Sequence, residues 1–327
     1  MILVTGGAGY IGSHTVKLLQ EHGYRVLTYD SLELGHEEAV TGGTIIHGDL
    51  LDLDGLEETF NHFPLDAVIH FAAYASVGDS VANPDKYFRN NIIGGMNLIN
   101  VMRAHNVENI IFSSSAATYG EPLHIPIEES HPQNPTNPYG ESKLAFERIL
   151  KWYDVSYGMK SISLRYFNAS GADPEGRIGE DHNPEEHLIP IVLQTALGQR
   201  ESVKVFGTDW DTPDGTCIRD YIHVNDLADA HIRALHALEK GTQTTAYNLG
   251  SGDGHSVKQV IETAEQVIGR KIPWEEAPRR PGDPARLVAS SDKIKKELKW
   301  KPHFPELHTI IEHAWQWHSA HPNGYGK

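Results

Sequence analysis

The stretch NPYGESK, which begins at Asn137, places Tyr139 four residues before Lys143. In a helix, residues i and i+4 lie on one face, so the phenol and the ammonium group can be neighbours. A nearby ammonium group favours the phenolate and lowers the pKa of the tyrosine, which could then take a proton from an alcohol. Such pairs also occur on ordinary surface helices, so the chemistry needs further support.

A serine cluster gives that support. The stretch FSSSAATYG, at 112–120, places Ser113, Ser114 and Ser115 at the end of an apolar segment that we expect to be a strand. In a doubly wound sheet, ligands bind beyond the carboxyl ends of the strands. A hydroxyl group there can hydrogen-bond the alcohol or carbonyl oxygen that is being transformed.

A glycine loop near the start of the chain would face the same edge. Gly6, Gly9 and Gly12 follow the apolar segment 1–5 at three-residue spacing and precede a helical pattern. This arrangement allows a tight turn, close approach of a pyrophosphate and a helix N-terminus that favours phosphate. Asp30 ends the next predicted strand, where a carboxylate can accept hydrogen bonds from a ribose and would repel a 2′-phosphate. The pattern predicts NAD binding rather than NADP binding.

The elements around these groups alternate between strand and helix. Continuously apolar segments predict buried parallel strands at 1–5, 25–30, 44–50, 67–73, 109–116 and 161–170. Helical patterns are expected at 10–22, 84–105, 139–157, 188–197, 226–239, 257–268 and 308–318. The predicted fold is α/β: a Rossmann-like doubly wound parallel sheet with a smaller mixed α/β C-terminal domain. We place the NAD-binding domain at 1–171 and the substrate domain at 172–327, parts of which, such as 219–250, could return to the first domain.

Composition limits the possible partners. The 327 residues include 28 basic and 44 acidic side chains, which give a formal charge of −16. Such a chain should repel nucleic acid and anionic membranes, so neither is an expected partner. One cysteine, Cys217, excludes an internal disulfide, and no signal peptide or membrane-spanning run is evident, so we expect a cytoplasmic protein. The twenty histidines, including His182 and His187, lack zinc-like spacing; we expect scattered surface residues and no metal site.

Eight stretches together resemble the extended short-chain dehydrogenase/reductase family and, within it, the UDP-glucose 4-epimerases. They are VTGGAGYIGSH, FSSSAATYGE, NPYGESK, LRYFNASGA, GEDHNPEEHLIP, DGTCIRDYIHVNDLA, YNLGSG and APRRPGDPARL. The resemblance runs along nearly the whole chain. It implies an isomerase that interconverts UDP-galactose and UDP-glucose through a transient 4-keto sugar, with tightly bound NAD.

The resemblance also implies roles for individual residues. Tyr139 would accept the proton, Lys143 would hold the nicotinamide ribose, and Ser115 would assist at the 4-hydroxyl group of the sugar. The implied cofactor contacts are Gly6, Gly9, Tyr10, Ile11, Gly12, Asp30, Ser31, Asp49, Leu50, Phe71, Ala72, Ala73, Asn90, Ser113, Tyr139, Lys143 and Phe167. Ala75 stands where some relatives carry a lysine on the cofactor, so cofactor affinity could differ.

The implied substrate contacts, besides Ser115 and Tyr139, are Asn168, Leu188, Val205, Phe206, Arg219, Arg280, Asp283 and Leu287. Two phosphate charges entering an acidic protein require a local group of arginines, which Arg279, Arg280 and Arg286 could supply. Relatives pair through helices that correspond to 84–105 and 139–157, so a homodimer is expected. The apolar side chains of Leu144, Phe146, Leu150 and Trp152 give this expectation some support.

Three other functions remain open at this point. A nucleotide-sugar 4,6-dehydratase needs an adjacent Asp and Glu where this chain has Ala116 and Ala117. Another epimerase, acting on UDP-xylose, UDP-arabinose or UDP-N-acetylhexosamines, is harder to separate, because Leu287 leaves moderate room beside the sugar. A protein that binds NAD without catalysis would be expected to have lost Tyr139, Lys143 or Ser115, and all three are present.

Overall fold

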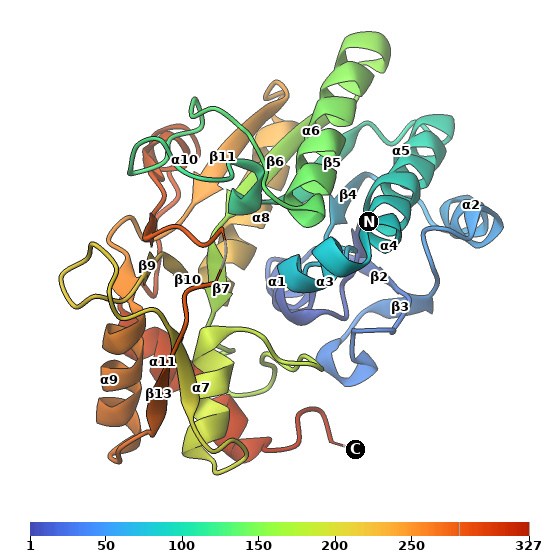
Figure 1. Ribbon diagram of the computed structural model, residues 1–327. Helices are drawn as coiled ribbons and strands as arrows, with labels where there is room; N and C mark the ends of the chain where they lie inside the picture. Colours follow the sequence, from blue (N-terminus) through green and yellow to red (C-terminus); the bar gives the residue numbers. More distant parts are fainter. Residues whose placement is uncertain (281, 327) are drawn as a thin grey trace.

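The core of the protein is a seven-stranded parallel sheet, seen in a computed structural model that describes residues 1–280 and 282–326 (Figure 1). The strand order is β11-β6-β5-β4-β1-β2-β3. The strands are β1 (Ile2–Thr5), β2 (Val26–Asp30), β3 (Thr44–His47), β4 (Ala67–His70), β5 (Asn109–Ser115), β6 (Lys160–Tyr166) and β11 (Thr245–Leu249). The order reverses between β1 and β4, which is where a doubly wound sheet binds its ligands. The predicted α/β fold is confirmed.

Helices cover both faces of this sheet. One face packs against α1 (Tyr10–Glu21) and α8 (Val224–Glu239), and the other against α2 (Leu53–His62), α5 (Gly95–Ala104) and α6 (Pro138–Tyr157). Successive strand residues serve opposite cores: Leu3 belongs to the core under α2 and α5, and Val4 to the core under α1 and α8. A strand buried on both faces has no polar side, which explains the continuous apolar runs in the sequence.

A smaller layer follows the sheet and lies at the lower left of Figure 1. Its apolar core joins α7 (Leu188–Ala196), α9 (Val257–Ile268) and α11 (Leu307–Ala320) to the parallel pair β8 (Val203–Phe206) and β13 (Trp274–Ala277). Two small sheets connect this layer to the large one. They pair β7 (Asn168–Ser170) with β10 (Tyr221–His223), and β9 (Ile218–Arg219) with β12 (His255–Ser256) and β14 (Arg286–Leu287).

The chain returns to the large sheet after entering the smaller layer. β11 pairs with β6, and α8 packs beside α1. The remaining short elements are α3 (Val77–Ala82), α10 (Asp292–Glu297) and the 3-10 turns at Glu37–Ala39 and Ala116–Thr118. Among the described residues, no helix is long and apolar enough to cross a membrane.

The helix predicted at 84–105 is interrupted. It consists of α4 (Pro84–Tyr87), a π-helical segment at Phe88–Gly94 and α5. The adjacent glycines have a packing reason, as a Cβ on Gly95 would lie 2.6 Å from the Phe146 ring and one on Gly94 would lie 3.1 Å from Leu50. Close packing of α6 and of the loop after β3 therefore requires glycine here, where π-helical turns often mark functional sites.

Three of the apolar residues offered in support of a dimer are core residues. Leu144, Phe146 and Leu150 are at most 2% exposed, so that part of the prediction is wrong. Trp152 is 67% exposed and does lie on the surface of α6.

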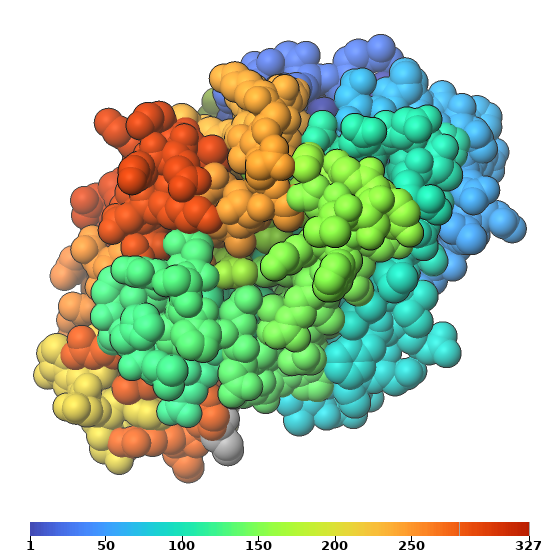
Figure 2. Space-filling view, turned by 90° about the horizontal axis from the view of Figure 1, so that it is seen from above, coloured from blue at the N-terminus to red at the C-terminus, as the bar shows by residue number. Residues whose placement is uncertain are grey.

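Seen from above, α6 lies beside the chain of α4 and α5, and the green segment after β5 contacts the orange-red C-terminal chain (Figure 2). That contact includes the Ile127 N–H donating to Val288 O at 2.9 Å.

Candidate active site

Tyr139 lies in the first turn of α6, which the sequence positions tightly. Asn137 caps the helix by accepting a hydrogen bond from Gly140 N–H at 2.9 Å, and Pro138 occupies the first turn. A Cβ on Gly140 would lie 2.5 Å from the carbonyl oxygen of Ala117. Only glycine allows this approach, so α6 begins directly against the chain that follows β5. The phenol of Tyr139 is thereby brought beside the hydroxyl group of Ser115.

Lys143 lies one turn further along α6 and points at the end of β5. Its Nζ donates to the carbonyl oxygen of Ser113 at 2.8 Å and lies 5.8 Å from the centre of the Tyr139 ring. The side chain is only 3% exposed. The Ser115 hydroxyl accepts from Ala117 N–H at 3.1 Å, and the Ser113 hydroxyl hydrogen-bonds Tyr166. The three residues selected from the sequence are therefore neighbours at the carboxyl end of the sheet.

The electrostatics of this group differ in one respect from the expectation. Burial raises the pKa of Tyr139, and a hydrogen bond from Ser115 lowers it in part. Burial also lowers the pKa of Lys143 to about 7, against the attraction of Glu147. The expected lowering of the phenol pKa by Lys143 is not seen in the protein without its cofactor, where burial is the largest cause and Lys143 is not among the causes.

The glycine loop is built for close contact with an anion. Gly6 has φ of +71°, and a Cβ on Gly12 would lie 2.1 Å from the Gly6 carbonyl oxygen, so both positions require glycine. Gly9 is the N-cap of α1 and offers no side chain to the helix, and the first turn carries no acidic residue. The free N–H groups and the helix dipole therefore remain available to phosphate. Asp30 is buried and accepts from Ala8 and Leu32 N–H, each at 2.9 Å.

The other predicted cofactor residues follow the ends of neighbouring strands. Phe71 and Ala72 follow β4 and donate their N–H groups to Thr5 O at 2.8 and 3.1 Å, which fixes them against the glycine loop. Asn90 lies in the π-helical segment, where its side chain donates to Asn91 at 3.0 Å. Ser113 lies within β5, near its end. The rest lie after β1, β2, β3, β4 and β6: Tyr10, Ile11, Ser31, Asp49, Leu50, Ala73 and Phe167. Ala75 is exposed.

The predicted substrate residues form a second group on the small sheets and in the smaller layer. Arg219 pairs with Asp283 at 2.5 Å, and the Arg280 guanidinium lies 4.0 Å from the centre of the Phe206 ring. The side chain of Asn168 donates to the carbonyl oxygen of Asp220, the residue after Arg219, at 2.8 Å. Leu287 lies next to Arg219, because β14 pairs with β9.

Four predicted positions of this region need separate placement. Leu188 begins α7, and the buried Val205 lies in β8. Arg286 is half-buried in β14, beside Ile218. Arg279 differs, because its guanidinium contacts Asp209 at 2.7 Å and lies over Trp210. The arginine group predicted from the sequence is therefore divided.

Asp220 is a structural residue that the sequence reasoning missed. It is fully buried, and its carboxylate accepts from Ser251 N–H and Oγ–H at 2.6 and 2.7 Å, Gly252 N–H at 3.2 Å and Ala289 N–H at 3.0 Å. It thus ties three loops together directly beside Arg219. The only sign of this role in the sequence is the position of the acid in the stretch RDYI, between Arg219 and two residues of a buried strand. The neighbouring sequence does not predict the loops that Asp220 binds.

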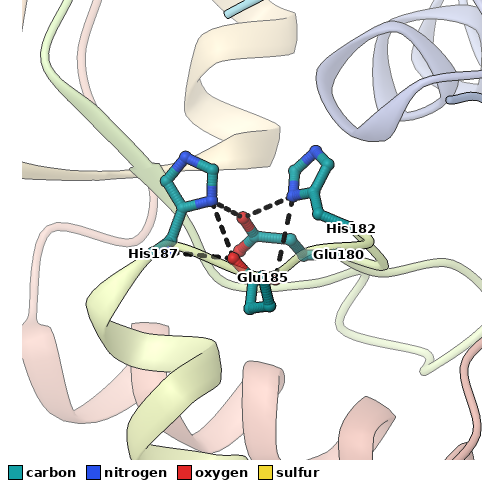
Figure 3. Close-up of side chains that lie close together, drawn as sticks. All are labelled: Glu180, His182, Glu185 and His187. Atoms are coloured by element: carbon teal, nitrogen blue, oxygen red, sulfur yellow. Dashed lines mark hydrogen bonds and ion pairs between the residues drawn. The ribbon is translucent and has the colours of Figure 1, made fainter. Parts of the chain in front are cut away.

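His182 and His187 lie in a loop, as expected, and the side chain of His187 is 54% exposed, but the two residues are not scattered. Both rings turn inward to Glu180 and Glu185, which are 3% and 7% exposed (Figure 3). The four ligand-type atoms lie within 4.8 Å of one another. A zinc-like spacing of ligands was the expected sign of a metal site, whereas these four donor groups all come from one short segment, 180–187.

Comparison with known proteins places this geometry in a family. Residues 2–250 match the NAD dependent epimerase/dehydratase family. The chain belongs to that family. A UDP-glucose 4-epimerase of Halalkalibacterium halodurans is 57% identical over 324 residues, which is 99% of this chain and 97% of the relative.

Two solved structures of this epimerase/dehydratase family extend the likeness to three dimensions. A UDP-glucose 4-epimerase from Brucella ovis in complex with NAD has a TM-score of 0.94 at 47% identity, covering 96% of this chain and 97% of the other. One from Bifidobacterium longum in complex with NAD+ and UDP has a TM-score of 0.93 at 40% identity, covering 99% of both chains. The likeness therefore includes the smaller C-terminal layer as well as the sheet.

Proposed function

We propose that the protein is a UDP-glucose 4-epimerase that interconverts UDP-galactose and UDP-glucose with NAD as a retained cofactor. The observation that carries the proposal is the meeting of Tyr139, Lys143 and Ser115 beside the glycine loop, in a chain similar over its whole length to UDP-glucose 4-epimerases. The family accounts for the NAD-dependent chemistry, and the substrate follows from those relatives.

The residues present fit NAD. Gly6 and Gly12 let the loop pack closely against Ala72 and against its own turn, and the N-terminus of α1 has N–H groups without a side-chain cap. Asp30 provides a buried carboxylate at the end of β2 for a ribose. Bound NAD supplies the acceptor and later the donor for the hydrogen on the sugar C4 carbon, together with a positive charge near the phenol. The protein's own part is to bind, orient and move protons.

Tyr139 takes the proton of the 4-hydroxyl group when the carbinol is oxidised and returns a proton when the ketone is reduced. Ser115 lies close enough to the phenol to lower the pKa of Tyr139, and in this proposal its hydroxyl group hydrogen-bonds the 4-oxygen of the sugar, so it holds the two in line. Lys143 is fixed by its hydrogen bond to Ser113 O at 2.8 Å and presents its remaining N–H bonds to a ribose hydroxyl group. Because a positive charge stabilises a phenolate, the Lys143 ammonium group and bound NAD would oppose the rise in the pKa of Tyr139 that burial causes.

UDP would be held by the second group of residues. Arg219 and Arg280 supply charge for the two phosphates, and Phe206 with Leu188 supplies apolar surface for the uracil ring. Anchoring through UDP leaves the sugar free to turn, which inversion at C4 requires. The 4-keto sugar can then present its opposite face to the reduced cofactor, which would return the hydride.

Two alternatives concern substrate and reaction. Ala116 and Ala117 lie in the 3-10 turn after Ser115, where a dehydratase needs an acid and a base, so elimination lacks its groups. Leu287 adjoins Arg219 and leaves room that would also admit UDP-N-acetylhexosamines. Comparing product formation from UDP-N-acetylglucosamine and UDP-glucose under one set of conditions tests this room argument; no product from the first would refute it. Turnover of UDP-xylose in the same assay would identify a UDP-pentose epimerase.

We also propose a homodimer formed by α4, α5 and α6. Exposed apolar side chains gather on the outer parts of these helices: Ile93, Trp152, Val155 and Tyr157 are 48 to 69% exposed. Arg103 of α5 lies 4.8 Å from the Tyr157 ring of α6, so this surface is continuous. Light scattering should give twice the chain mass for the parent protein and less for Trp152→Glu; a monomeric parent would refute the proposal.

The decisive experiment is incubation with UDP-galactose without added NAD, followed by NMR of the product. UDP-glucose should form, and Lys151→Met on the exposed face of α6 should behave as the parent does. If no UDP-glucose forms while the purified protein contains NAD, the proposed activity is wrong. In that case the protein would bind NAD without this catalysis.

A further inference from the structure

Four side chains between the large sheet and α7 surround a common point, although the reaction does not use them. Glu180, His182, Glu185 and His187 come from one eight-residue segment, and their ligand-type atoms face one another (Figure 3). The two glutamates are buried, whereas the side chains of His182 and His187 are 32% and 54% exposed. We propose that this cluster is a structural zinc site with one ligand atom from each side chain. Two imidazole nitrogens and two carboxylate oxygens are a ligand set that Zn²⁺ accepts.

The distances fit tetrahedral coordination. His187 Nδ1 lies 3.0 Å from Glu180 Oε1 and 2.9 Å from Glu185 Oε1. His182 Nδ1 lies 3.2 Å from Glu180 Oε1 and 3.8 Å from Glu185 Oε2. Zinc bonds of about 2.0–2.1 Å place tetrahedral ligand atoms about 3.3–3.4 Å apart. The four ligand-type atoms lie within 4.8 Å of one another, so the wider pairs would have to close by small movements of the side chains when the metal binds.

The directions of these groups favour a metal over a network of hydrogen bonds. Glu180 Oε1, His182 Nδ1 and Glu185 Oε2 are buried atoms without a hydrogen-bond partner. His182 and Glu180 are thus close enough to bond, but their lone pairs and N–H direction do not meet. Buried polar atoms are usually satisfied, so three unsatisfied atoms at one point require an explanation. A cation at the common point would satisfy all of them.

Charge balance allows the same assignment, although two protonated imidazoles would also balance the two carboxylates. Two carboxylates with side chains only 4% and 2% exposed are costly unless they are paired. Among the described residues, their ion-pair partners are His182 and His187 alone. One Zn²⁺ with two neutral imidazoles balances both carboxylates. Four protein ligands leave no open position, so the role is structural rather than catalytic.

The position of the cluster indicates what the metal would hold in place. Tyr10, next to the glycine loop, packs edge-on against the His182 ring at 6.1 Å between ring centres. Glu186 accepts from Ser76 Oγ at 2.7 Å, and His36 contacts Asp181 O at 3.1 Å. Directly after His187, α7 begins with Leu188. Zinc would therefore hold the connection between the glycine loop and α7.

The test uses full-length protein with its nucleotide, freed of any polyhistidine tag, treated with a chelator and gel-filtered. Titration with Zn²⁺ followed by elemental analysis should give one metal per chain, and the melting temperature should rise with added Zn²⁺. Co²⁺ in place of Zn²⁺ should give the intense visible absorption of four-coordinate cobalt. No stoichiometric Zn²⁺, or the weak spectrum of six-coordinate cobalt, would overturn the proposal.

Variants locate the metal. His182→Gln and Glu185→Gln should each weaken Zn²⁺ binding at least about 10–100-fold, since even groups that only orient metal ligands have effects of this size. His308→Gln, at an exposed position on α11, is the matched control and should bind as the parent does. Retained nucleotide and an unchanged circular dichroism spectrum show that a variant is folded. Equal Zn²⁺ affinity in parent, variants and control would refute the assignment, and the cobalt spectrum of the parent decides the matter if a variant fails to fold.

Discussion

Lys143 should lower the stability of the protein, and Lys143→Met should relieve that effect in a pH-dependent way. The side chain is 3% exposed, and burial lowers the pKa of its ammonium group from 10.5 to about 7. In the unfolded chain Lys143 keeps its proton up to about pH 10.5, whereas in the folded protein it loses the proton near pH 7. The free energy of unfolding therefore increases as the pH rises from 7 to 10.5 and decreases as the pH drops back towards 7. The cost of burying the charge is complete below about pH 6.

The magnitude follows from the shift of 3.5 pKa units, 10.5 minus 7. At about 1.4 kcal/mol per unit, the charge costs about 4–5 kcal/mol at pH 6 and about 1 kcal/mol at pH 9.5. Methionine also removes the hydrogen bond to Ser113 O, which contributes about 1 kcal/mol. The variant should therefore be more stable than the parent by about 3 kcal/mol at pH 6 and about equal to it at pH 9.5.

Urea unfolding of nucleotide-free protein at the two pH values measures this difference. Lys151→Met is the control, since Lys151 lies on the exposed face of the same helix and should show no such pH-dependent gain. A difference between parent and Lys143→Met that is the same at both pH values would refute the reasoning. Activity should be lost in the Lys143 variant, so gained stability and lost turnover would appear together.

The remaining predictions concern the site and its supports. Tyr139→Phe should lower turnover about 10²–10⁴-fold, the usual contribution of a general base, while nucleotide content stays unchanged; near-parent turnover would contradict the assigned role. Gly12→Ala should abolish nucleotide retention, measured by absorbance after gel filtration, because its Cβ would meet the Gly6 carbonyl oxygen at 2.1 Å; Gly23→Ala, where a Cβ meets nothing within 4 Å, is a spatial control that carries only the strain of its positive φ. Asp220→Asn should destabilise the protein by about 2–4 kcal/mol in urea unfolding, since an amide NH2 would face N–H donors; Asp211→Asn, at an exposed position, should be neutral, and equal effects would refute the argument. Arg219→Lys should raise the KM for UDP-galactose more than it lowers kcat, because its loss affects binding of the UDP part; a pure kcat effect would argue against a phosphate contact.

Much of the large sheet was predictable because its residues act locally. The apolar runs at 1–5 and 109–116 predict strands by themselves, and the spacing of Gly6, Gly9 and Gly12 requires the loop that the structure contains. Tyr139, Lys143 and Ser115 could be grouped in advance because strand ends of a parallel sheet meet at one edge. Their juxtaposition is thus a consequence of topology.

Other features depend on contacts that the sequence does not reveal. β11 joins the large sheet by pairing with β6, some eighty positions earlier in the chain, although its own residues give only a short strand signal. The π-helical interruption at 88–94 arises where Gly95 packs on Phe146. The pKa of Tyr139 in the protein without cofactor is raised by burial, which a sequence does not show, whereas the prediction rested on the positive charges of Lys143 and of the nicotinamide.

The way the chain passes between its two parts limits how they can move. β7 pairs with β10, β9 lies between β12 and β14, and Asp220 fastens the loops at Ser251 and Ala289 to the same place. A hinge needs one or two flexible connections, whereas here several strand pairs would have to break before the parts could swing open. We therefore expect a stiff body in which side chains and short loops admit the nucleotide sugar, and in which the half-turn between the two reaction steps is made by the sugar itself.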